Sequence, residues 1–157
     1  MFLFEKKVKI FSVTDHNYFS KDYYDLLEKY VYDHNIDMKI INGAEFDVYV
    51  TLKDGSEEFI HICIYFDDNV NREELEKIVN KLYKNDDGSE NKPHFNDVLD
   101  ALYPLNCKMI IVPHGDKERG IFKNSLMNKI AINMDDDYYK YAMYKIFNAY
   151  DVRISFS

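Results

Sequence analysis

EFDVYVTLKDGSEEFIHICIYF, residues 45–66, carries the strongest fold signal in the chain. Two segments rich in β-branched and aromatic residues, 45–52 and 57–66, flank the dipeptide Asp54-Gly55. Asp-Gly between two such segments is typical of a tight β-hairpin. The sequence therefore predicts two antiparallel strands joined at Asp54-Gly55.

On both sides of this hairpin, short apolar segments alternate with helical patterns. Ser20 and Asn71 suit the N-caps of two helices, and Asn42-Gly43 suits a turn before the hairpin. Strands alternating with helices favour an α/β fold with a mostly parallel sheet that the one β-hairpin interrupts. The expected strands are 8–13, 38–41, 107–112 and 152–156, and the expected helices are 21–34, 72–82, 95–102 and 138–150.

Composition limits the class of protein. The 157 residues are 46% hydrophobic and carry a formal net charge of −8, which suits one acidic globular domain over residues 1–157. No long apolar run predicts a membrane span, and the charged residues at 5–7 do not suit a signal peptide, so we expect a cytoplasmic protein. The acidity argues against a basic surface that binds nucleic acid directly.

The two cysteines, Cys63 and Cys107, form no spaced zinc motif. Both lie in apolar segments, so we expect buried, reduced thiols. No serine or cysteine pairs with a base in a pattern that predicts nucleophilic catalysis.

Three histidines and one glutamate fall in or next to the expected strands. His16 follows the first strand, Glu45 begins the hairpin, His61 lies within it, and His114 follows the segment 107–112. Imidazole and carboxylate groups are the usual ligands of Zn²⁺, Mn²⁺ and Fe²⁺, and a sheet can bring strand ends together. Alternatively, the histidines are hydrogen-bonded loop or core residues, and Glu45 is an ordinary edge residue.

These segments resemble motifs of the PHP (polymerase and histidinol phosphatase) family. Residues 12–17, Ser-Val-Thr-Asp-His-Asn, are similar to the strand of that family that ends in Thr-Asp-His. Gly43-Ala44-Glu45 resembles its Gly-x-Glu motif. Residues 59–66 resemble its next strand, and residues 109–115 resemble a later strand that ends in histidine.

The resemblance implies an incomplete or distorted (βα)7-like barrel that hydrolyses phosphate mono- or diesters with bound metal. It implies that His16, Glu45, His61 and His114 hold one or two divalent ions (Zn, Mn or Fe). Glu45 would bridge two ions, and Asp15 would orient a ligand or the loop. The substrate would be a phosphorylated small molecule or a nucleotide. Separately, Lys117 and Arg119 either contact a substrate phosphate or belong to a solvated charged loop.

The His-x-His and Asp-x-His motifs that begin and end the family pattern have no counterpart here. We therefore expect a domain truncated at both ends relative to the family, whose open barrel edges are covered by self-association or by a partner. The alternative function is a non-catalytic interaction or regulatory module. A weaker resemblance to PHP domains fused to bacterial ABC/SMC-like ATPases would link such a module to a defence system.

Overall fold

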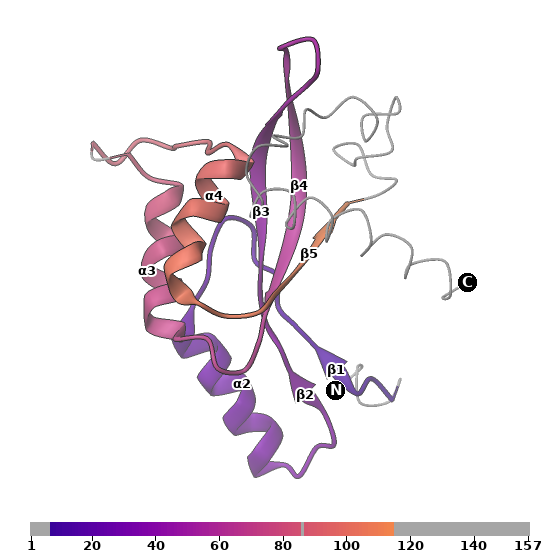
Figure 1. Cartoon of the computed structure of the whole chain (residues 1–157). Helices are drawn as coiled ribbons and strands as arrows, with labels where there is room; N and C mark the ends of the chain where they lie inside the picture. The colour runs from indigo at the N-terminus through magenta and orange to yellow at the C-terminus, as the bar shows by residue number, and fades with distance from the viewer. Residues whose placement is uncertain (1–6, 86, 115–157) are drawn as a thin grey trace.

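The structure, a computed structural model, describes residues 7–85 and 87–114 (Figure 1). The expected helix 138–150 and the expected strand 152–156 lie outside these residues. No helix in the described part of the chain is long and apolar enough to cross a membrane. The elements follow the order β1 (Ile10–Phe11), α2 (Lys21–Asp33), β2 (Lys39–Ile40), β3 (Asn42–Thr51), β4 (Glu57–Phe66), α3 (Arg72–Leu82), α4 (Phe95–Leu102), a short 3₁₀ helix (Tyr103–Leu105) and β5 (Met109–Pro113).

The predicted hairpin is confirmed. β3 and β4 pair antiparallel along their whole lengths, from Asn42 opposite Phe66 to Thr51 opposite Glu57. Gly55 takes a φ of +83° in the connecting turn, a conformation that favours glycine. The predicted turn at Asn42-Gly43 is wrong, because both residues belong to β3 and pair with β4.

The expected mostly parallel, (βα)7-like sheet is wrong. The larger sheet has the order β3-β4-β5 and is antiparallel throughout, and within residues 7–85 and 87–114 the only strands that pair in parallel are the two-residue strands β1 and β2. The reason is the connection from β4 to β5, which contains two helices. The segment between α3 and α4 meets the far part of β3, where the Tyr49 N–H donates to the Pro93 carbonyl at 3.1 Å. α4 then returns the chain to the end where β4 stopped, and β5 starts opposite Phe66.

The first strand is shorter than the expected strand 8–13, because its pairing with β2 ends at Phe11. The chain then crosses close above Gly43, where an added Cβ atom would lie 2.5 Å from the Ser12 Oγ atom. The buried Tyr24 hydroxyl fixes this crossing, since it hydrogen-bonds to the Val13 carbonyl and accepts the Gly43 N–H at 2.9 Å. The chain rejoins the outer edge of β3 at His16, which forms a parallel bridge with Glu45.

The three-stranded sheet has one apolar face, which we call the core face. Its side chains come from alternate strand positions, and each is less than 9% exposed. Figure 1 shows α3 and α4 side by side next to β3. Buried helix residues, among them Leu75, Val79, Val98 and Leu99, join the strand residues in one core cluster. The strand positions of the core face are Ala44, Phe46, Val48, Val50, Ile60, Ile62, Ile64, Phe66 and Ile111.

The helix signals within the described residues are confirmed. The Ser20 side chain accepts the Tyr23 N–H at the start of α2. The Asn71 side chain accepts two N–H groups in the first turn of α3. α4 spans the expected residues, Phe95–Leu102.

Candidate metal centre

The face opposite the core face carries the candidate metal ligands, and we call it the site face. Strand side chains alternate between faces, so residues two apart share one. Glu45 and Asp47 of β3 lie opposite Cys63 and His61 of β4, respectively. His114 follows β5, and its N–H donates to the His61 carbonyl at 3.0 Å. The sheet therefore places ligand-type side chains from three neighbouring segments next to one another.

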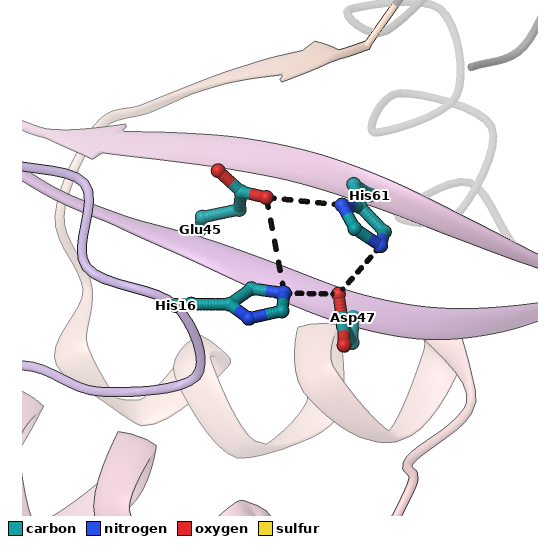
Figure 2. Close-up of side chains that lie close together, drawn as sticks. All are labelled: His16, Glu45, Asp47 and His61. Carbon is teal, nitrogen blue, oxygen red and sulfur yellow. Dashed lines mark hydrogen bonds and ion pairs between the residues drawn. The ribbon is translucent and has the colours of Figure 1, made fainter. Parts of the chain in front are cut away.

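Four of these side chains form a compact group, shown in Figure 2: His16, Glu45, Asp47 and His61. The His16 Nε2 atom lies 2.6 Å from Asp47 Oδ1 and 3.8 Å from Glu45 Oε1. His61 Nδ1 lies 3.0 Å from Glu45 Oε1, and His61 Nε2 lies 3.0 Å from Asp47 Oδ1. One ligand atom from each of the four residues lies within 4.8 Å of every other.

Asp47 is the residue of this group that the sequence interpretation missed. Its side chain is only 10% exposed and contacts both His16 and His61. A signal was present, because a residue two positions after Glu45 on a strand must share its face. The pattern Glu-x-Asp within the hairpin is therefore sufficient to predict a second carboxylate at the site.

His16 reaches the group from a loop held by the backbone. The Glu45 N–H donates to the Asp15 carbonyl at 3.0 Å, and the Asn17 N–H donates to the Glu45 carbonyl at 2.8 Å. Asn17 takes a φ of +57°, which ends the short parallel pairing. Asp15 thus holds Glu45 through its main chain, and its own side chain is exposed.

The backbone of Asp47 is anchored at the outer edge of β3 by two side chains. Its N–H donates to the Asn17 Oδ1 atom at 2.8 Å, and its carbonyl accepts the Tyr83 hydroxyl at 2.9 Å. Burial, followed by the nearby Asp47 charge, raises the pKa of Tyr83 well above its usual range, so this hydroxyl remains a donor. Asn17 and Tyr83 therefore fix a candidate ligand without contacting the ligand atoms.

A second group adjoins the first and shares Glu45 with it. It consists of Glu45, Cys63 and His114, whose ligand atoms again lie within 4.8 Å of one another. Glu45 uses its two oxygens differently: Oε1 faces His61, and Oε2 lies 3.7 Å from His114 Nε2. Next to Cys63, burial and the neighbouring thiol raise the pKa of Tyr65 to about 12.

The first group fits a divalent metal ion on two grounds. Bonds of about 2.0 Å at tetrahedral angles place ligand atoms roughly 3.3 Å apart. The four nitrogen–oxygen separations given above run from 2.6 to 3.8 Å, and one ligand atom from each residue lies within 4.8 Å of every other. The Glu45 and Asp47 carboxylates are 19% and 10% exposed, so their repulsion is poorly screened and favours a bound cation. Whichever nitrogen of His61 binds an ion, the other faces a carboxylate that can orient the ring.

The structure brings together the four predicted ligands His16, Glu45, His61 and His114, although in two groups rather than one. The predicted phosphate contacts Lys117 and Arg119 lie outside the described residues. No protein-family model matches the chain, and no curated protein matches it significantly.

Proposed function

We propose that the protein is a metal-dependent hydrolase that acts on phosphate esters through the group His16, Glu45, Asp47 and His61. The observation that carries the proposal is the convergence of four ligand atoms, from two imidazoles and two carboxylates, within 4.8 Å. They come from a loop and two strands, so the fold rather than one local motif assembles them.

The chemistry that a bound divalent ion supplies here is polarisation of a phosphate ester and a lower pKa for water. An anionic substrate would otherwise be repelled by a chain with a net charge of −8. The His16 side chain is 51% exposed, whereas the other three are between 10% and 19% exposed. Solvent and substrate therefore reach the group on the His16 side.

The chain's own residues hold this geometry. Asp15 and Asn17 fix Glu45 through the backbone, and Asn17 and Tyr83 fix Asp47. The carboxylates orient both histidine rings, since each ring nitrogen of His61 faces one of them. The resemblance of residues 12–17 and 43–45 to PHP motifs supports phosphate esters as the substrate class.

Metal analysis and hydrolysis of model phosphate esters test the proposal. Protein purified without chelator should contain Zn, Mn or Fe, and added metal at about 100 times its Kd should stabilise the apoprotein by about 2.7 kcal/mol. Asp47→Asn should lose at least about tenfold in metal affinity and lose hydrolysis of a phosphomonoester and a phosphodiester.

Asp37→Asn is the matched control, because Asp37 is an 87% exposed carboxylate paired only with Lys9 among the described contacts. It should bind metal and hydrolyse the esters like the wild type. Protein that neither contains these metals nor gains stability from them contradicts the proposal and favours the non-catalytic module.

A further inference from the structure

The second group on the site face, Glu45, Cys63 and His114, offers a different set of ligand types from the first. It joins a thiol to an imidazole and a carboxylate, and the three ligand atoms lie within 4.8 Å of one another. We propose that this group binds a second metal ion with the Cys63 thiolate as a ligand, which makes the site selective for Zn²⁺, Co²⁺ or Fe²⁺. The proposal rests on the proposed function for the first ion, and it adds the sulfur ligand and the metal class.

The distances are close to those that such an ion requires. The Cys63 Sγ atom lies 3.9 Å from His114 Nε2, and Glu45 Oε2 lies 3.7 Å from the same nitrogen. Metal–sulfur bonds of about 2.3 Å and metal–nitrogen bonds of about 2.0 Å at tetrahedral angles give a sulfur–nitrogen separation of about 3.6 Å. Shifts of a few tenths of an ångström would therefore bring these two pairs to the separations that an ion requires, and the Cys63 and Glu45 ligand atoms lie within 4.8 Å of each other.

Glu45 is placed to join the two ions. Its Oε1 atom faces the first group, 3.0 Å from His61 Nδ1, and its Oε2 atom faces His114. The His61 and His114 rings are also neighbours, with centroids 5.5 Å apart. One carboxylate thus contributes one oxygen to each group, so each ion would take its own ligand atom from Glu45.

Cys63 differs from the other thiol in its position. Cys107 packs against the core cluster, whereas Cys63 lies on the site face opposite Glu45, only 8% exposed. A buried thiol beside an imidazole and a carboxylate is a metal-ligand environment, and binding would release the thiol proton to solvent. Thiolate ligands favour Zn²⁺, Co²⁺ and Fe²⁺ over Mg²⁺, Ca²⁺ and Mn²⁺.

Cobalt substitution tests the sulfur ligand directly. The full-length apoprotein is titrated with Co²⁺, and its near-ultraviolet absorption is followed for a thiolate-to-cobalt charge-transfer band. We expect the band in the wild type and in Cys107→Ser, and we expect Cys63→Ser to lose the band together with one bound ion per chain. A wild type without the band, or a band that persists in Cys63→Ser, overturns the proposal.

A measurement on the unmodified protein covers the case in which Cys63→Ser fails to fold. X-ray absorption of the zinc-loaded wild type should show a sulfur neighbour at about 2.3 Å from zinc. A spectrum with only nitrogen and oxygen neighbours overturns the proposal. Phosphate ester hydrolysis by the same samples separates the two claims: sulfur ligation without hydrolysis refutes the proposed function alone, and hydrolysis by zinc-loaded protein without sulfur ligation refutes the second site alone.

Discussion

The two faces of the β3–β4–β5 sheet are built from the same strands but carry opposite kinds of side chain, apolar on one and polar on the other. The core face holds side chains such as Phe46 and Ile62, both fully buried in the core cluster to which α3 and α4 also contribute. The site face holds their immediate neighbours, Asp47 and His61, whose polar atoms contact one another. Adjacent residues of one strand therefore have different roles. One side chain stabilises the fold through burial, and the next brings a potential ligand atom to the site face.

This difference indicates that the geometry of the site face depends on packing of the core face, whereas the stability of the core face does not depend on the site residues. Apolar burial on the core face favours folding in proportion to the area removed from water. On the site face, two poorly exposed carboxylates lie beside the His16 and His61 rings. Packing on the core face thus fixes the strand positions that hold these polar side chains together.

The largest expected effect comes from truncation on the core face. Phe46→Ala removes a side chain with no exposed surface and leaves a cavity between the sheet and the helices. The free energy of unfolding should fall by about 3–5 kcal/mol. Urea unfolding followed by circular dichroism measures this loss.

Its neighbour Asp47 provides the contrast on the site face. In the absence of metal, Asp47→Asn should change the free energy of unfolding by no more than about 1 kcal/mol, because it also relieves repulsion from Glu45. In the presence of Zn²⁺, the variant should lack the extra stability that the wild type gains. Equal losses for Phe46→Ala and Asp47→Asn in metal-free protein would contradict the division between the faces.

The sequence predicts the elements that local signals define. Asp54-Gly55 specifies the hairpin, and Ser20 and Asn71 specify helix starts, because caps and tight turns depend on a few neighbouring residues. The site residues His16, Glu45 and His61 are also predictable, since the two strands of the hairpin and the loop beside β3 bring them together.

Whether two neighbouring strands are parallel or antiparallel is not predictable from such local signals. It depends on how many helices the chain forms between the two strands. The polar stretch 85–93 looks in the sequence like an ordinary surface loop, yet the chain reverses its direction between α3 and α4. That turn makes β5 antiparallel to β4. The split of the ligands into two groups depends on the resulting sheet register, which places Cys63 opposite Glu45 and Asp47 opposite His61.

A substitution at Gly43 should cause an intermediate loss of stability, because the site face has no room for a side chain at this position. A Cβ atom there would lie 2.5 Å from Ser12 Oγ, 3.0 Å from Tyr65 Cδ1 and 3.3 Å from Thr14 Cγ2. Gly43→Ala should therefore lower the free energy of unfolding by about 1–3 kcal/mol. Thermal unfolding monitored by circular dichroism measures the change.

The double variant Ser12→Ala/Gly43→Ala identifies the cause. It removes the nearest atom, so part of the loss caused by Gly43→Ala alone should be recovered, and the two effects should not be additive. Strict additivity would show that the close approach of residue 12 to β3 is not what requires a glycine.

A small loss of stability is expected from a substitution at the rim of the core face, where polar contacts rather than burial join α3 to α2. The Arg72 guanidinium donates to Asp25 Oδ1 at 2.7 Å, to Glu28 Oε2 at 2.9 Å and to Asn42 Oδ1 at 2.7 Å. The two carboxylate side chains are 44% and 47% exposed, so solvent weakens these ion pairs. Arg72→Gln should lower the free energy of unfolding by about 1 kcal/mol at neutral pH, measured by urea unfolding.

The pH dependence of this loss separates the ion pairs from simple packing. Hydrogen bonds from Lys21 and then from Arg72 hold the pKa of Asp25 below its ordinary value of 3.8. A lowered pKa contributes stability above the ordinary value, and that contribution disappears as the pH falls through the folded-state pKa. The difference between wild type and Arg72→Gln should therefore be constant from neutral pH to about pH 5 and shrink below pH 4. A difference that persists unchanged at pH 3 would mean that the arginine acts through contacts that do not titrate there, its hydrogen bond to Asn42 and its packing over the Tyr24 ring, 5.7 Å away.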